Sequence, residues 1–65
     1  MEEELKDRFG RIRGRIKQES GRLVIYNYLG MRLGYYDGRA TYDKLGRIVG
    51  YGNLLVLFLK NEFDI

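Results

Sequence analysis

The ten residues Tyr42–Tyr51, Y-D-K-L-G-R-I-V-G-Y, decide the fold, because they repeat a segment that lies sixteen positions earlier. The earlier copy is Tyr26–Tyr35, Y-N-Y-L-G-M-R-L-G-Y, and a shorter third copy is Asp7–Gly14, D-R-F-G-R-I-R-G. Each copy places Asp or Asn three residues before a Gly. A short polar side chain that bonds nearby backbone, followed by a Gly at positive φ, is typical of a tight hairpin connection. Each copy therefore predicts one β-hairpin, and the three together predict a meander.

The segment Tyr42-Asp43-x-x-Gly46-Arg47-Ile48 also resembles the YD-type tandem β-hairpin repeats of large bacterial surface and toxin-associated shells. This resemblance implies an extended β-sheet and a structural or sugar-binding role rather than catalysis. The Tyr26 copy departs from the pattern, with Asn27 in place of Asp and Met31 in place of Arg. Those proteins carry many repeats and this chain has at most three, so only the hairpin geometry of the family is carried over to this chain, and the resemblance adds some weight to a role in assembly.

The chain has 65 residues, which predicts one small domain spanning residues 1–65. A domain of this size buries little surface and usually needs disulfides, a metal or association with other chains for stability. The sequence has no Cys and no His, so we expect no disulfide, no metal and no cofactor. Association remains, and we expect a homo-oligomer.

The net charge of +3 is unevenly distributed, because residues 8–53 hold ten basic residues against three acidic ones. A basic segment bears on solubility and on partners rather than on fold. No apolar run approaches the ~20 residues of a membrane helix, so no membrane partner is expected. The absence of Cys is consistent with a cytoplasmic protein.

The pattern of turns and β-forming residues predicts five to six short strands. The expected strands are Arg11–Lys17, Arg22–Tyr28, Met31–Tyr36, Arg39–Tyr42, Arg47–Tyr51 and Leu54–Leu59. Met1–Arg8 is predicted to form a short helical turn. The rhythm of the chain favours a strand over Leu54–Leu59, although Asn53 could equally cap a short helix there.

Turn chemistry predicts the register of the central strands. Ile25 is expected opposite Leu33, Tyr35 opposite Ala40, and Tyr42 opposite Ile48. One face then forms the core, and the other is a lattice of tyrosine and arginine. The predicted core face holds Leu23, Ile25, Leu33, Tyr35, Ala40, Tyr42 and Ile48. The predicted opposite face holds Val24, Tyr26, Tyr28, Arg32, Tyr36, Arg39, Thr41, Arg47, Val49 and Tyr51. These residues suggest an apolar face that is closed as a small barrel or covered by dimerisation.

The alternating stretch Arg11–Lys17 fits this register poorly. Continuing the register through Gln18–Gly21 places Arg13, Arg15 and Lys17 on the core side. Either a bulge shifts the register, or this strand projects past the sheet as a basic edge. The sequence does not decide which face the strand presents.

Catalysis is poorly served by these residue types, and we expect no enzyme. Without His or Cys there is no imidazole base and no thiolate. Asp7, Asp37 and Asp43 each open a predicted turn, and Ser20 lies in another turn. The spaced glycines lack the Lys-Ser/Thr ending of a phosphate-binding loop.

Two functions remain. The first is a non-enzymatic all-β module that acts through self-association or protein-partner binding, with Leu54, Val56 and Phe58 as the candidate subunit interface. The alternative is nucleic-acid binding by a basic strand and a Tyr/Arg sheet face. Its candidate contacts are Arg11, Arg13, Arg15, Lys17, Tyr26, Arg32, Tyr36, Arg39 and Arg47.

Overall fold

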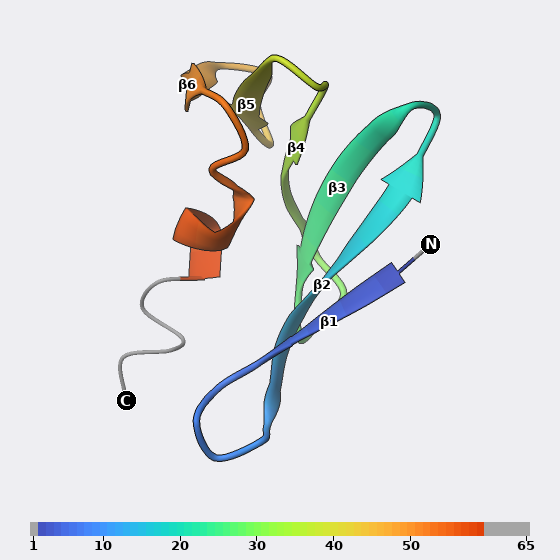
Figure 1. Ribbon diagram of the computed structural model, residues 1–65, viewed down its shortest axis with the longest axis vertical. Helices are drawn as coiled ribbons and strands as arrows, with labels where there is room; N and C mark the ends of the chain where they lie inside the picture. The colour runs from blue at the N-terminus through green and yellow to red at the C-terminus, as the bar shows by residue number, and fades with distance from the viewer. Residues whose placement is uncertain (1, 60–65) are drawn as a thin grey trace.

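The computed structural model describes residues 2–59, which form one six-stranded antiparallel sheet followed by a short 3-10 helix (Figure 1). The elements are β1 (Glu2–Lys6), β2 (Ile12–Glu19), β3 (Arg22–Asn27), β4 (Arg32–Tyr36), β5 (Ala40–Asp43), β6 (Ile48–Tyr51) and η1 (Leu55–Leu59). Strands that are neighbours in the sheet are also consecutive in the sequence. The predicted all-β meander is therefore confirmed, as a sheet with open edges at β1 and β6 rather than a closed barrel.

The three repeated turns share one hydrogen-bond pattern, at the connections β1–β2, β3–β4 and β5–β6. In the last of them, Asp43 Oδ1 accepts from the backbone N–H groups of Leu45 and Arg47, at 2.9 Å each. The N–H of Asp43 donates to the carbonyl of Arg47, and that of Gly46 donates to the carbonyl of Asp43. Asp7 and Asn27 accept the equivalent bonds in the other two turns. The Asp7–Gly14 copy, which is the shortest in sequence, therefore forms all the hydrogen bonds of the repeated turn.

The third residue after the Asp or Asn is a Gly at positive φ in every copy. The φ angles are 81° at Gly10, 84° at Gly30 and 84° at Gly46. L side chains rarely adopt this conformation, which explains why Gly closes each turn.

A β-bulge follows each repeated turn. In β4, Tyr26 pairs with Arg32 whereas Ile25 pairs with Gly34, which leaves Leu33 as the extra residue. Arg13 and Val49 are the extra residues in the other two hairpins. A bulge places two residues opposite one, and so it reverses the faces of the strand beyond it.

The bulge at Leu33 explains the main error in the predicted register. Tyr26 opposite Arg32 agrees with the predicted turn, but Ile25 then lies opposite Gly34 instead of Leu33. Leu23 and Ile25 lie on the core face as predicted, and Leu33 packs at its margin. The predicted core residues that fall on the opposite face are Tyr35, Ala40, Tyr42 and Ile48. Tyr36 and Thr41 take the core side instead.

The β4–β5 turn adds a second shift, one that leaves the faces unchanged. Asp37 N–H donates to the carbonyl of Ala40, so Gly38 and Arg39 form the centre of the turn. Tyr35 therefore pairs with Tyr42 rather than with Ala40, which corrects that prediction. The predicted pairing of Tyr42 with Ile48 is confirmed.

The β2–β3 connection resolves the position of the basic strand. Ser20 and Gly21 form a two-residue turn, with φ angles of 52° and 77°. Two positive φ values match the twist of a tight hairpin. Ile16 then pairs with Ile25 on the core face, while Arg15 and Lys17 point to the opposite face. The chain needs neither a bulge in this turn nor a projecting edge.

Both ends of the chain differ from prediction. Residues Glu2–Lys6 form β1, so the predicted helical turn over Met1–Arg8 is wrong for the residues that the structure describes; Met1 lies outside them. Strand pairing with β2 outweighs the intrinsic helix propensity of this acidic stretch. The favoured strand over Leu54–Leu59 is also wrong, because Leu55–Leu59 is a 3-10 helix whose first N–H bonds to Asn53 Oδ1 at 3.1 Å.

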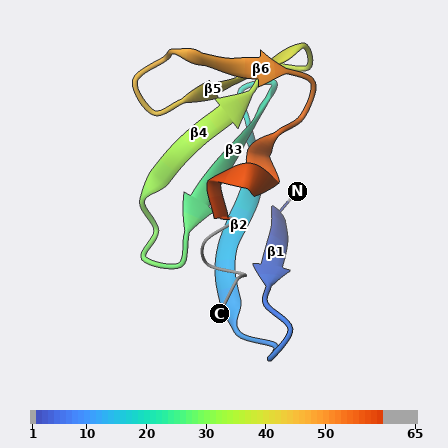
Figure 2. The same ribbon diagram turned by 90° about the vertical axis from the view of Figure 1, so that its left-hand side faces the viewer.

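The core lies between one face of the sheet and η1, which crosses it in Figure 2. Its buried residues are Ile16, Ile25, Leu55 and Leu59. The glycine that ends each repeat lies under a side chain of the C-terminal segment. A Cβ on Gly14 would meet Leu59, one on Gly34 would meet Phe58, and one on Gly50 would meet Leu54. The repeats therefore provide three shallow positions that side chains of η1 and of Leu54, the residue before it, fill.

Candidate functional site

The face of the sheet opposite η1 is covered by tyrosines and basic side chains in contact with one another. Tyr35 and Tyr42, which pair across β4 and β5, stack with their ring centroids 5.0 Å apart. The Arg22 guanidinium lies 4.5 Å from the Tyr35 ring, and Lys17 Nζ lies 5.4 Å from the Tyr26 ring. We call this surface the outer face.

Several charged and polar side chains of the outer face form ion pairs or hydrogen bonds with one another. Arg15 Nε lies 3.3 Å from Glu2 Oε2, and Arg15 Nη2 lies 3.6 Å from Glu4 Oε2. The Tyr26 hydroxyl donates to Glu19 at 2.6 Å. This hydrogen bond is the leading reason that the pKa of Tyr26 is raised, since losing the proton would place a phenolate beside a carboxylate.

Asp7 is the buried charged residue of the described part of the chain, with 2% of its side chain exposed. Its Oδ2 accepts from the Nε atoms of Arg11 at 3.0 Å and Arg13 at 3.2 Å. Burial alone would raise the pKa of Asp7. Two backbone N–H groups and the two guanidinium groups outweigh burial and lower that pKa to about 2. Asp7 therefore acts as an anchor for the first turn.

Asp37 and Asp43 also hold turns, as predicted. Two backbone N–H groups, from Ala40 and Arg39, lower the pKa of Asp37. The backbone N–H of Arg47 is the main cause of the lowered pKa of Asp43, and Arg47 Nε also donates to Asp43 at 3.1 Å. Both carboxylates accept hydrogen bonds from the backbone of the turns that they stabilise, so neither is presented as a free acid–base group.

The structure gathers only some of the predicted nucleic-acid contacts. Arg13, Arg15, Lys17 and Tyr26 lie near one another on the outer face. Tyr36 lies on the core side, packed against the buried cluster. Arg32, an exposed residue of β4, pairs with Tyr26 and so lies beside the outer-face group. Arg39 lies in the β4–β5 turn. Arg11 and Arg47 lie in repeated turns, each bonded to the Asp of its turn.

The three predicted interface residues, Leu54, Val56 and Phe58, do not share one surface. Leu54 and Phe58 pack onto Gly50 and Gly34 of their own chain. Val56 is exposed, together with its neighbour Leu57. Only Val56 of the predicted set therefore lies on the solvent side of the C-terminal segment.

The acidic partners of the outer face were missed because Glu2–Lys6 was predicted to be helical. A signal was available in the sequence. Glu2 and Glu4 alternate with the same period as Arg15 and Lys17, and β1 pairs these residues directly with β2. Opposite charges facing each other across two strands favour that pairing.

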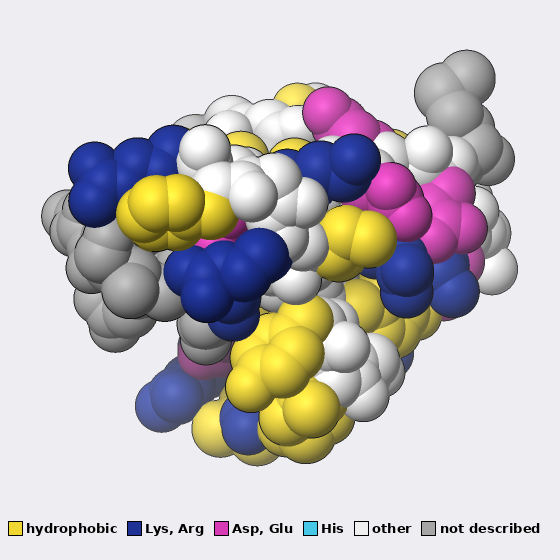
Figure 3. Space-filling view, turned by 90° about the horizontal axis from the view of Figure 1, so that it is seen from below, with side chains coloured by type: hydrophobic (Ala, Val, Ile, Leu, Met, Phe, Trp, Pro, Cys, Tyr) yellow, Lys and Arg dark blue, Asp and Glu magenta, His cyan; other side chains and the backbone are white. Residues whose placement is uncertain are grey.

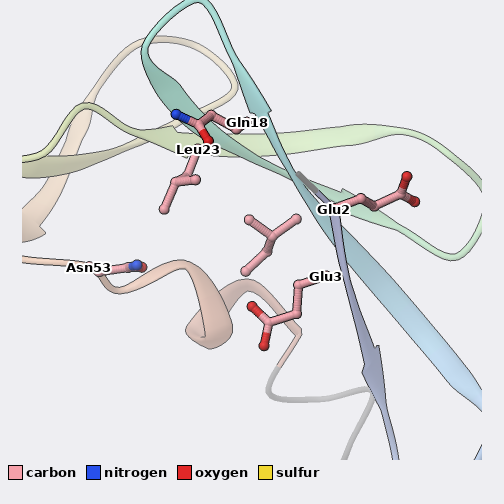
Figure 4. Close-up of a pocket in the computed structure, with 6 residues that line it drawn as sticks. Glu2, Glu3, Gln18, Leu23 and Asn53 are labelled. Carbon is pink, nitrogen blue, oxygen red and sulfur yellow. The ribbon is translucent and has the colours of Figure 1, made fainter.

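A shallow pocket of about 220 Å³ lies between the start of β1 and the segment before η1. Ile16, Leu23 and the polar side chains of Glu2, Glu3, Gln18 and Asn53 line it. Figure 4 shows the carboxylate of Glu2 turned away from the other side chains. The remaining polar groups of the pocket are the carboxylate of Glu3 and the amides of Gln18 and Asn53.

The described residues thus define a small all-β sheet module in which part of the charge on the outer face is ion-paired. Within residues 2–59, no helix is long and apolar enough to cross a bilayer. That same part of the chain holds no group of three or more His, Cys, Asp or Glu placed to bind a metal ion. Comparison with protein-family models, curated protein sequences and solved structures finds no match.

Proposed function

We propose that this chain is a non-enzymatic module that associates with a second copy of itself through the exposed edge of β6. The carrying observation is the contrast between the two edges of the sheet. β1 carries Glu2, Glu3, Glu4 and Lys6, whereas β6 reads Ile48-Val49-Gly50-Tyr51 and has no charge. Charges on an edge strand are one of the devices that block unwanted pairing, and β6 carries none.

The side chains of β6 support this assignment. Ile48, Val49 and Tyr51 are all exposed, and Tyr51 keeps 76% of its surface. Among the described residues, β6 has a neighbour on one side only, β5. The backbone groups on the other side of β6 are therefore open to an added strand.

An antiparallel pair of β6 strands would be symmetric, the arrangement that most homodimers use. It would bring Ile48 of one copy near Tyr51 of the other. Both residues lie on the outer face, since they pair with Tyr42 and Ala40. The row Tyr35–Tyr42–Ile48 would then continue into the second copy without a break and without like charges meeting.

The nucleic-acid alternative has less support from the geometry. Arg11, Arg13 and Arg15 are all ion-paired within the chain. The rings of Tyr26 and Tyr35 already carry a cation each, which occupies surface that a base would stack on. Binding of nucleic acid would require these internal contacts to be exchanged.

The proposal is tested by sedimentation equilibrium of the full chain and of two single variants. Ile48→Lys places a charge on the β6 edge, and Val56→Lys places one on the exposed side of η1. We expect a dimer for the parent chain and for Val56→Lys, and a monomer for Ile48→Lys. Both sites are exposed, so circular dichroism should show unchanged folding.

Two other results would count against the β6 edge. A parent chain that is monomeric at every concentration removes self-association altogether. If Val56→Lys dissociates the dimer and Ile48→Lys does not, the interface lies on the C-terminal segment rather than on β6. Fluorescence anisotropy with labelled DNA and RNA at near-physiological salt tests the alternative, because nonspecific attraction to a basic protein fades as salt rises.

A further inference from the structure

The tips of the three repeated turns each expose one large apolar side chain. These are Phe9, Leu29 and Leu45, with 63%, 67% and 69% of their surface exposed. Each is the residue directly before the positive-φ Gly of its turn. The chain has therefore placed an apolar side chain at the same solvent-facing position three times.

The side chains at this position take no part in the hydrogen bonds that hold the turns. The residue at this position contributes its backbone N–H to the Asp or Asn of the turn, as Phe9 does to Asp7 at 2.8 Å. Any residue could donate that bond, and none of the three side chains belongs to the buried cluster. A polar residue would serve the turn equally well, so the apolar choice calls for another explanation.

The three tips lie along one border of the sheet. In a meander, alternate connections fall at the same end, and the β1–β2, β3–β4 and β5–β6 connections alternate. Figure 2 shows them following one border, from the blue turn at the bottom to the orange turn at the upper left. We call this border the tip ridge, and it comprises residues 8–11, 28–31 and 44–47.

Charge and apolar surface are ordered along the tip ridge. Its centre is apolar, because Tyr28, Leu29 and Met31 are all exposed there. Its two ends add basic residues to the apolar tip: Arg8 and Arg11 beside Phe9, and Lys44 and Arg47 beside Leu45. Arg11 and Arg47 each bond to the Asp of their turn through Nε, and 52% and 73% of their side chains stay exposed. The carboxylates of Asp7 and Asp43 are turned inward to their own backbone.

The first tip shows the arrangement in detail. The guanidinium carbons of Arg8 and Arg11 lie 5.1 Å and 5.2 Å from the Phe9 ring. An aromatic ring flanked by cations suits a boundary where the ring enters an apolar medium and the cations stay with anions. Seen from below, Lys and Arg side chains border hydrophobic ones across this end of the molecule (Figure 3).

We infer that the tip ridge docks onto the surface of an anionic lipid bilayer, with the apolar tips in the headgroup region and the basic residues on lipid phosphates and carboxylates. Aliphatic tips decide between this partner and a nucleic acid. Transfer of the side chains of Leu29, Met31 and Leu45 from water to the boundary between headgroups and acyl chains is favourable in free energy. These side chains have no aromatic ring on which a base could stack. Attachment of this kind combines apolar insertion with electrostatic attraction.

Surface docking needs no membrane-spanning segment. The expectation that this chain has no membrane partner rested on the lack of an apolar run long enough to cross a bilayer. A ridge of tips enters only the interfacial region, so that reasoning does not apply to it. Docking is also independent of pairing through β6, because each copy carries a complete ridge.

The chain has no Trp, so one introduced Trp reports its own surroundings. We would compare Leu29→Trp with Val56→Trp, which places the reporter on the exposed side of η1. Vesicles of phosphatidylcholine with phosphatidylserine should shift the emission of Leu29→Trp to shorter wavelength and leave that of Val56→Trp unchanged. Vesicles of phosphatidylcholine alone should shift neither variant.

Co-sedimentation with the same vesicles gives a second readout. The triple variant Phe9→Ser, Leu29→Ser, Leu45→Ser should lower partitioning by about tenfold or more. The control variant Val56→Ser, Leu57→Ser removes exposed apolar residues that lie outside both the tip ridge and β6, and it should bind like the parent. The proposal is overturned if the parent ignores anionic vesicles, if the control variant loses as much binding as the triple variant, or if Leu29→Trp shows no shift.

Discussion

The ring of Phe58 lies directly on Gly34, so closely that a Cβ on Gly34 would come within 2.6 Å of the ring Cζ. Gly34 ends the second repeat, and Phe58 belongs to η1, so this contact joins the repeated sheet to the segment that covers it. The same Cβ would also overlap the carbonyl oxygen of Tyr42 on the neighbouring strand. Both the helix and the strand pairing therefore require Gly at this position.

Gly34→Ala is expected to destabilise the fold by about 1–3 kcal/mol, the usual cost of overpacking a core. Gly50→Ala is the matched control, because its Cβ would meet only the Cδ1 of Leu54 at 2.7 Å. The end of a flexible side chain can move aside, whereas a backbone carbonyl cannot. Urea denaturation of both variants measures the difference, and equal losses would show that η1 does not sit on the glycines as described.

Asp7 should make the stability of the protein depend on acid pH. Its pKa is lowered from 3.8 to about 2 in the folded chain. A lowered carboxyl pKa stabilises the folded state above the ordinary value, and this contribution is lost as pH falls from about 4 to about 2. Thermal melting across that pH range should show the loss.

Asp7→Asn should retain the first turn and lose part of this acid dependence. Asn27 already shows that an amide oxygen accepts both backbone bonds of the turn. Asn lacks the charge that Asp7 presents to Arg11 and Arg13, so stability at neutral pH should fall. Asp43→Asn is the control and should have a smaller effect, because Asp43 faces one arginine on an exposed turn. Acid melting profiles that are identical for Asp7→Asn and the parent chain would contradict the role given to Asp7.

Much of this fold could be predicted from the repeat, because turn chemistry is local. The Asp or Asn and the Gly of each copy lie within four residues, and they determine the hairpin wherever it occurs. The bulge after each turn was not predictable in the same way. The bulge in β4 accompanies the placement of Gly34 beneath Phe58, a residue twenty-four positions away, and the local turn pattern carries no information about that contact.

Both ends of the chain were mispredicted for a related reason. Glu2–Lys6 favours a helix by local propensity, but β2 presents Arg15 to Glu2 and Glu4 and so favours a strand. Leu55–Leu59 has the composition of a buried strand, but the covered row of glycines leaves room for a helix. Of the candidate site, the basic strand could be predicted, whereas the ion pairs of Arg15 with Glu2 and Glu4 of β1 could not.

Thr41 connects β5 to the start of η1 and is fully buried. Its hydroxyl donates to the carbonyl of Gly52 at 2.7 Å and accepts from the N–H of Leu54 at 2.9 Å. Thr41→Val keeps the shape but leaves both backbone groups without this partner, which should cost about 1–3 kcal/mol. Thr41→Ser keeps the hydroxyl and should cost about 1 kcal/mol for the lost methyl group. If chemical denaturation ranks Ser below Val, packing rather than hydrogen bonding governs this position.

Ser20 is the only described residue other than Gly with a positive φ, at 52°, and it opens the tight turn between β2 and β3. Asn tolerates this conformation better than Ser, and Asn-Gly is the preferred pair for a two-residue hairpin turn. Ser20→Asn is therefore expected to stabilise the protein by about 0.5 kcal/mol. Ser20→Val should destabilise it by about 1–2 kcal/mol, because a side chain branched at Cβ crowds the backbone at positive φ more than the unbranched Ser does. Chemical denaturation measures both. Equal stability of the two variants would mean that Ser20 does not hold a positive φ in solution, and the register that turns Arg15 and Lys17 to the outer face would lose its support.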